Sequence, residues 1–155
     1  MPVLDLHISP NIYAWEIIES EEELRELVSL SEVELDLIFS FNRKQRRKEM
    51  LATRALLGTI IPNEYIHYKN RAPFLVKANK EISISNSKKI VVIQLNDKKK
   101  NTGVDIQYFS DTVLRVKHKF LHQNEFNLIK GDDVSEVLNI IWSAKETLYK
   151  AFTED

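Results

Sequence analysis

The chain has 155 residues, of which 43% are hydrophobic and 29% charged, which suffices for one good core and excludes a chain that is disordered as a whole. It contains no cysteine, which excludes disulfide bonds, thiolate metal sites and a cysteine nucleophile. The net charge of −1 gives no general reason to expect nucleic acid or an anionic membrane as a partner, so any anion site has to be local.

The N-terminal residues predict a cytoplasmic protein that begins with strands and short helices. Residues 1–7 lack a basic segment followed by a long apolar run, and no later stretch could span a bilayer. Apolar and polar residues alternate over 4–8 and again over 13–17, which predicts two half-buried strands. Ser20 and Ser31 are each followed three positions later by glutamate, the spacing of the capping box, so two short helices are expected to begin there.

A longer helix is expected over residues 42–60, and Pro62 would end it. Arg43, Arg47 and Arg54 lie near one another on one side of this helix. Its other side carries an apolar stripe of Met50, Leu51, Ala55, Leu57 and Ile61. Such a basic helix can bind nucleic acid or an acidic protein, but in a charge-balanced chain it is more often a solvated face.

Short β segments are expected next, at residues 65–68, 74–76, 82–85 and 90–95. The polar run 96–101 is then typical of an exposed turn. We place a boundary there, between an N-terminal α+β lobe, residues 1–101, and a C-terminal lobe, residues 102–155.

The second half is expected to be mostly helical after one strand at 103–107. Ser110 can cap a helix that carries Val113, Val116 and Phe120. A short helix is expected around residues 124–130, ending at Gly131. The long final helix is marked by Val134, Val137, Leu138, Ile141 and Leu148.

The predicted strand at 103–107 offers two oxygen ligands. If Val104 and Ile106 enter the core, Asp105 and Gln107 project together from the opposite face. The pair can contact a divalent cation, although two polar residues on an edge strand are more often a plain solvated surface.

The final helix carries a second charged group. Glu146 and Lys150 are four residues apart and share a face, Trp142 lies one turn earlier, and Lys145 flanks them. Two acids with nearby ammonium groups suit a divalent cation that carries a pyrophosphate. The alternative is a solvated Lys-Glu-Lys face, which is common on helices.

Together with residues 82–87 and the segment 54–57, these motifs resemble the 4'-phosphopantetheinyl transferase superfamily, specifically its surfactin-type branch, from residue 49 to the end. In that family a Gly-Val/Ile-Asp-x-Glu strand accompanies a Trp-Ser-x-Lys-Glu-x-x-x-Lys helix. The helix motif is matched throughout by Trp142, Ser143, Lys145, Glu146 and Lys150. The resemblance implies an α+β fold of two pseudo-symmetric lobes, the second incomplete here. It also implies a holo-acyl-carrier-protein synthase type of enzyme, which moves the phosphopantetheine arm of coenzyme A to a serine of an acyl or peptidyl carrier protein.

The resemblance also implies the roles of individual residues. Asp105, Glu146 and Gln107 would hold Mg²⁺. Lys150 and Lys145 would stabilise the transition state, and Glu146 would accept the proton of the carrier serine. Coenzyme A would contact Lys44, Arg47, Arg54, Ser85, Asn86 and Lys150.

The chain departs from the family pattern at several positions. Gln107 stands where the family has Glu, Asn86 where it has His, and Ala72 where it has Lys, and each change removes or weakens a charge contact, unless Arg71 or Lys69 reaches the phosphate that the lysine would contact. Family members continue past the helix that contains Lys150, so a homo-oligomer that completes the second lobe is expected if the chain is complete. These departures favour an alternative, a catalytically impaired member that acts as a carrier-protein or nucleotide-binding module.

Overall fold

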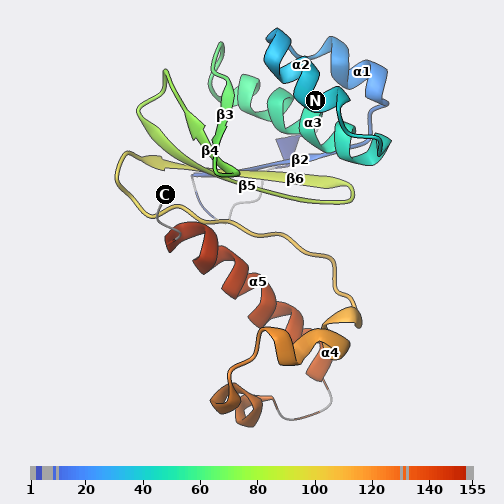
Figure 1. Ribbon diagram of the computed structural model, residues 1–155, viewed down its shortest axis with the longest axis vertical. Coiled ribbons are helices and arrows are strands. Elements are labelled where there is room, and N and C mark those ends of the chain that lie inside the picture. The colour runs from blue at the N-terminus through green and yellow to red at the C-terminus, as the bar shows by residue number, and fades with distance from the viewer. Residues whose placement is uncertain (1–2, 5–8, 10, 130, 132, 153–155) are drawn as a thin grey trace.

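The structure is a computed structural model that describes residues 3–4, 9, 11–129, 131 and 133–152 (Figure 1). Its fold is mixed α+β, as the sequence predicts. The elements in chain order are β1 (Val3–Leu4), β2 (Ile12–Glu16), α1 (Glu21–Glu26), α2 (Glu32–Phe39), α3 (Lys44–Ile60), β3 (Ile66–Lys69), β4 (Ala72–Leu75), β5 (Lys80–Ser87), β6 (Ile90–Asp97), α4 (Thr112–Val116), the 3₁₀ turns η1 (Lys117–Lys119) and η2 (Gln123–Leu128), and α5 (Val134–Phe152).

The centre of the fold is a four-stranded antiparallel sheet in the order β1-β2-β6-β5, and β3 and β4 form a separate hairpin. Figure 1 shows α1, α2 and α3 on one side of this sheet and α5 on the other. The strands predicted from alternation in the N-terminal half are confirmed to within a few residues, although residues 5–8 of the first lie outside the described residues. In the described part of the chain, no helix combines the length and the apolar character needed to cross a bilayer.

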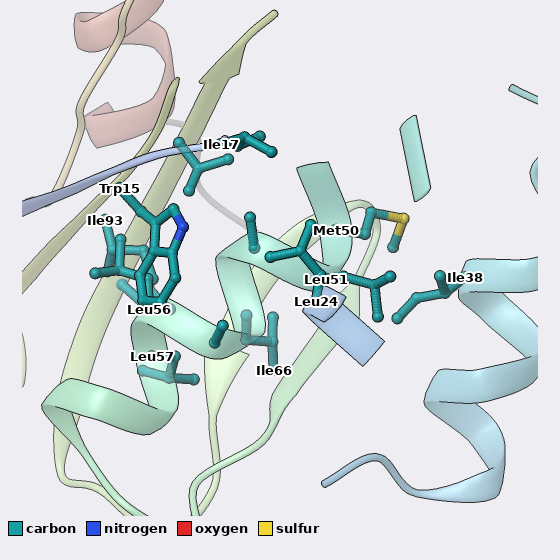
Figure 2. Packing of buried hydrophobic residues seen from close by; sticks show 14 of the residues in the cluster. Trp15, Ile17, Leu24, Ile38, Met50, Leu51, Leu56, Leu57, Ile66 and Ile93 are labelled. Carbon is teal, nitrogen blue, oxygen red and sulfur yellow. The ribbon is translucent and has the colours of Figure 1, made fainter. Parts of the chain in front are cut away.

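The main core lies between the sheet and α3. Trp15 of β2 and Ile93 of β6 pack there against Leu51 and Leu56 of α3, and all four side chains are almost fully buried (Figure 2). The predicted helix 42–60 is therefore confirmed as α3, and its apolar stripe is the face that covers the sheet. Burial of large apolar side chains on this scale is the main stabilising term of a fold of this size.

Both predicted capping boxes are present. Ser20 accepts a hydrogen bond from the Glu23 amide and the Glu23 carboxylate accepts one from the Ser20 amide, at 3.1 and 2.7 Å. Ser31 and Glu34 make the same reciprocal pair at the start of α2. Each pair satisfies backbone donors that the first helical turn leaves free, which explains where α1 and α2 begin.

The strand predicted for residues 103–107 is wrong. The segment is extended and crosses the face of the sheet opposite α3, where Val104 packs on Ala14 and Val92. Its amides do not join a ladder, because serine hydroxyls of β5 accept their hydrogen bonds: Val104 N–H donates to Ser83 and Ile106 N–H donates to Ser85, at 3.1 and 3.2 Å. The segment is thus fixed to the sheet through side chains.

The helices of the second half are partly as predicted. Ser110 accepts a hydrogen bond from the Thr112 amide, at 3.2 Å, but α4 ends at Val116 and continues only as the 3₁₀ turn η1. The predicted helix 124–130 is the 3₁₀ turn η2, with residue 130 outside the described residues. α5 is confirmed, although Leu148 is exposed and does not belong to its buried stripe.

Gly103 allows the crossing segment to lie directly against α5. A Cβ atom at this position would lie 2.2 Å from the Thr147 carbonyl oxygen and 2.9 Å from the Ala151 Cβ atom. Contacts this short force the backbone of the helix or of the segment to move. The glycine therefore sets the distance between Asp105 and the helix that faces it.

Gly103→Ala is expected to lower the free energy of unfolding by about 1–3 kcal/mol, because the new methyl group overpacks the contact with α5. Gly58→Ala is the matched control, since a Cβ at Gly58, inside α3, would meet nothing within 4 Å. That control is expected to raise the free energy of unfolding by about 0.5–1 kcal/mol. Urea unfolding followed by circular dichroism measures both, and equal effects of the two variants would contradict the close approach at Gly103.

Candidate functional site

The carboxylate of Asp105 lies between β5 and α5 and has three side-chain donors. Lys150 Nζ and Ser85 Oγ donate to its Oδ1 atom, at 2.8 and 3.0 Å, and Ser143 Oγ donates to Oδ2 at 2.9 Å. Only 6% of the Asp105 side chain is exposed. Both carboxylate oxygens are therefore already engaged.

The environment of Asp105 favours its charged form. Burial acts to raise the pKa of the carboxyl group, but the hydrogen bonds from Lys150 and Ser143, together with the Lys150 charge, outweigh burial and hold the pKa below its usual value. Lys150 also donates to the Val104 carbonyl oxygen at 2.9 Å. The ammonium group thus ties α5 to the crossing segment at two points.

Glu146 lies on the same side of α5 as this cluster. Ser143 and Lys150, which both contact Asp105, are one turn before and one turn after Glu146, so the three side chains share a face of the helix. Glu146 is half-buried and, among the described residues, has no hydrogen-bond or ion-pair partner. The structure therefore brings Asp105 and Lys150 into contact and places Glu146, a carboxylate without a partner among the described residues, on the same face of α5.

Two of the predicted site residues lie away from this face. Lys145 points to the other side of α5, where its ammonium group donates to the Phe120 carbonyl oxygen and to Glu125, both at 2.6 Å. Gln107 is exposed and makes no hydrogen bond to another described residue. The structure does not bring either residue into contact with Asp105.

A cleft of about 320 Å³ opens beside the Asp105 cluster. It lies between α3, the β3–β4 hairpin and β5, with Lys150 at its α5 side. Its described lining includes four cations and no acid: Arg46, Met50, Thr53, Arg54, Tyr68, Arg71, Pro73, Ile84, Ser85, Asn86 and Lys150. This balance of charge suits an anionic ligand.

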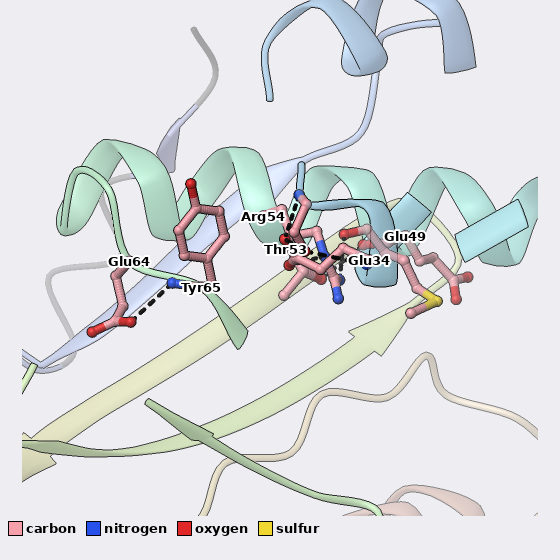
Figure 3. A network of polar contacts seen from close by, with 8 residues as sticks. Glu34, Glu49, Thr53, Arg54, Glu64 and Tyr65 are labelled. Atoms are coloured by element: carbon pink, nitrogen blue, oxygen red, sulfur yellow. Dashed lines mark hydrogen bonds and ion pairs between the residues drawn. The ribbon is translucent and has the colours of Figure 1, made fainter. Parts of the chain in front are cut away.

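Arg54 is the buried cation of the cleft. Its side chain is 5% exposed and forms an ion pair with Glu34, at 2.9 Å, while Nη1 donates to the Met50 carbonyl oxygen (Figure 3). The remaining nitrogen, Nη2, is buried and has no partner among the described residues. Because an unsatisfied buried donor is costly, a ligand oxygen in the cleft would remove a penalty that the free protein carries.

Arg46 is a cleft residue that the sequence analysis does not identify. Its Nη1 atom donates to the Asn86 side-chain oxygen at 3.0 Å, so Asn86 positions a cation in the cleft. Arg71, one of the two residues that could replace the lysine missing at Ala72, lies in the β3–β4 turn with a left-handed backbone, φ 72°, and lines the cleft, whereas Lys69 does not. Helical spacing could have found Arg46, which is one turn before Met50 and two before Arg54.

The other residues predicted to contact coenzyme A either pair with acids outside the cleft or belong to the hydrogen-bond cluster around Asp105. Lys44 is exposed and pairs with Glu22 at 3.7 Å, and Arg47 makes a two-pronged pair with Glu21, which raises the pKa of the guanidinium. Neither lies in the cleft lining. Ser85 does line the cleft, but its hydroxyl already donates to Asp105.

These pairs also bear on the basic helix. Acids of α1 and α2 neutralise Lys44, Arg47 and Arg54, so the patch on which a nucleic-acid interface would depend is largely paired internally. Three of the cations that line the cleft are paired as well, Arg46 with Glu49, Arg54 with Glu34 and Lys150 with Asp105. Arg71 is the cleft cation that has no ion pair with another described residue.

The residues present fit a magnesium ion that is held in part by its substrate. No group of three or more His, Asp or Glu side chains in the described part of the chain could enclose a metal. Mg²⁺, however, commonly uses one or two carboxylates together with water and phosphate oxygens. Asp105 and Glu146 supply this minimal set, next to a cleft suited to phosphate.

The comparison with protein families agrees with this geometry. Residues 101–155 match the family model of the 4'-phosphopantetheinyl transferase superfamily. No curated protein matches the chain. The matched segment contains Asp105, Ser143, Glu146 and Lys150, and it supports phosphopantetheine transfer in general terms.

Asp105→Asn is expected to lower the free energy of unfolding by about 1.5–3 kcal/mol at neutral pH, because Lys150 loses its charged partner. The pKa of Asp105 is lowered in the folded protein, so its stabilising effect is complete above the ordinary value of 3.8 and is lost as the pH falls through the lower folded-state pKa. The difference between the variant and the wild type should therefore shrink below that pH. Asp97→Asn is the control, since Asp97 also pairs with lysines but is exposed. Urea unfolding at a series of pH values measures the effect, and an Asp105→Asn protein as stable as the wild type at pH 7 would contradict it.

Proposed function

We propose that the protein transfers the 4'-phosphopantetheine arm of coenzyme A to a serine of an acyl or peptidyl carrier protein, in a magnesium-dependent reaction of the surfactin-type branch. The observation that carries the proposal is the Asp105–Lys150 pair at the side of a cationic cleft, with Glu146, which has no partner among the described residues, on the same face of α5. The family match of residues 101–155 supports it independently.

The cleft supports the binding of coenzyme A through its phosphates. Arg54 offers the buried Nη2 donor, and Arg46, Arg71 and Lys150 add three cations around it. Guanidinium groups bind phosphate oxygens in a planar, two-pronged manner, which suits the 3′-phosphate and the pyrophosphate of this ligand. Tyr68 and Pro73 give the cleft apolar walls for the rest of the nucleotide.

Asp105 and Glu146 would hold Mg²⁺. When bound, the ion would neutralise the negative charge that develops on the leaving phosphate. The carrier serine oxygen attacks the β-phosphorus of coenzyme A, a new P–O bond forms, and the bond to 3′,5′-adenosine bisphosphate breaks. Glu146, directly or through water, accepts the serine proton. Lys150 stabilises the negative charge of the transferred phosphate.

Two further proposals concern the parts of the molecule around the site. We retain residue 101 as the boundary between an N-terminal and a C-terminal lobe, supported by the start of the family match at that residue.

Lys145 and Gln107 make no contact with Asp105. We propose that Lys145 supports the reaction indirectly, by holding Glu125 and the η2 turn against α5. Homo-oligomerisation stays a prediction.

Incubation with coenzyme A, Mg²⁺ and an apo carrier protein is expected to add the mass of phosphopantetheine to the carrier. Glu146→Gln should abolish this transfer, because the amide cannot accept the serine proton. Glu136→Gln, an exposed residue of the first turn of α5, is the matched control and should retain the wild-type rate. Mass spectrometry of the carrier provides the measurement.

Two outcomes would count against this function. A wild-type rate in the Glu146→Gln protein would remove Glu146 from the reaction. Coenzyme A binding without any transfer to several carriers would favour a catalytically impaired binding module.

Arg71→Ala is expected to weaken coenzyme A binding by roughly ten- to a hundredfold, which corresponds to the loss of one charged hydrogen bond. Lys69→Ala is the matched control in the same hairpin, because Lys69 is not part of the cleft lining. Isothermal titration calorimetry measures both affinities. If Lys69→Ala weakens binding more than Arg71→Ala, the cleft is not where the phosphates bind.

A further inference from the structure

Lys150 belongs to two sites at once. Its ammonium group is 2.8 Å from Asp105 Oδ1, and the same residue lines the cationic cleft. No other cationic side chain in the described residues contacts Asp105, whose remaining side-chain partners are the hydroxyls of Ser85 and Ser143. The charge balance of the carboxylate therefore depends on where Lys150 points.

A metal ion bound through Asp105 Oδ1 would compete with the ammonium group, which already donates a hydrogen bond to that atom. A divalent cation bound through Asp105 Oδ1 would meet the positive charge of Lys150 at close range, and this repulsion opposes metal binding. The two serine hydroxyls do not have this effect, because they are neutral and can continue to orient the carboxylate. Lys150 is therefore the contact that has to change before the carboxylate can bind a metal.

The side chain of Lys150 is suited to such a change. It has a flexible four-carbon stem and a single point of charge, and 27% of it is exposed. A phosphate in the cleft would offer the ammonium group a second anionic partner without moving α5. Asp105 would then have no cationic partner, and a metal ion could take the place of the ammonium group.

We propose that Lys150 couples the two sites: an anionic ligand in the cleft draws the ammonium group away from Asp105, so that the ligand binds first and the divalent cation follows. The identity of the ligand rests on the proposed function, whereas the competition at Asp105 does not. Because binding free energies are linked, the metal must strengthen ligand binding by the same factor that the ligand strengthens metal binding. Couplings of this kind typically amount to about 5- to 150-fold.

The test is the binding of Mn²⁺ as a probe, measured from the electron paramagnetic resonance of the free ion with and without saturating coenzyme A. For the wild type, coenzyme A should tighten Mn²⁺ binding at least fivefold, after correction for Mn²⁺ bound by coenzyme A alone. Lys150→Met should bind Mn²⁺ more tightly than the wild type when coenzyme A is absent. It should also gain clearly less from coenzyme A, because the competing ammonium group is gone.

The controls separate this competition from other causes. Lys80→Met removes the lysine of an exposed ion pair with Asp97 and should behave as the wild type. Asp105→Asn in the Lys150→Met background should lose the tight Mn²⁺ binding, which identifies the site. Should Lys150→Met fail to fold, as judged by circular dichroism, Lys150→Gln keeps a neutral donor beside Asp105 and takes its place.

Unchanged or weaker Mn²⁺ binding by the Lys150 variant would overturn the proposal. So would an equal effect of coenzyme A on the variant and the wild type, since direct coordination of the metal by the ligand predicts equal coupling in both. A wild type that does not bind coenzyme A would instead overturn the proposed function. Inorganic phosphate would then replace coenzyme A in the coupling measurement, with the same two outcomes deciding the role of Lys150.

Discussion

The ion pair between Asp105 and Lys150 is the contact on which the rest of the site depends. It joins the segment that crosses the open face of the sheet to the helix that covers this segment, and it does so in a place where only 6% of the Asp105 side chain is exposed. Charges buried to this extent are tolerated only when they are paired and hydrogen-bonded. Ser85, Ser143 and the Val104 carbonyl oxygen complete that requirement, so β5, α5 and the crossing segment meet at one carboxylate.

The same arrangement explains how the fold positions a charged site between the sheet and α5. Gly103 lets the segment approach α5 closely, and the serines of β5 fix its amides without a β ladder. Once the segment is fixed, the periodicity of α5 determines that Ser143, Glu146 and Lys150 face it. On the other side of β5, Asn86 accepts a hydrogen bond from Arg46, and the β3–β4 turn places Arg71 in the lining of the cleft.

Much of this structure could be predicted from sequence because the signals are local. The capping boxes at Ser20 and Ser31, the apolar face of α3 and the alternation in β5 are each visible as a pattern within a few residues. The extended segment 103–107 was predicted as a strand because its alternation is that of a strand, and the sequence does not indicate that side-chain hydroxyls replace the backbone partner. Arg47 and Lys145 are cations that the sequence motifs predict to contact the ligand. In the structure they pair instead with Glu21 and Glu125, two acids that are distant in the sequence. Such long-range partners are set by tertiary packing, which no local pattern encodes.

We expect one divalent cation to be held between the segment and α5, beside phosphates in the cleft. A crystal structure of the protein with Mn²⁺ and coenzyme A measures this most directly, through the anomalous signal of the metal. A single peak is expected between the carboxylates of Asp105 and Glu146, with the pyrophosphate at the mouth of the cleft and Lys150 turned toward it. A peak elsewhere, or coenzyme A bound outside the cleft while Lys150 still contacts Asp105, would rule this arrangement out.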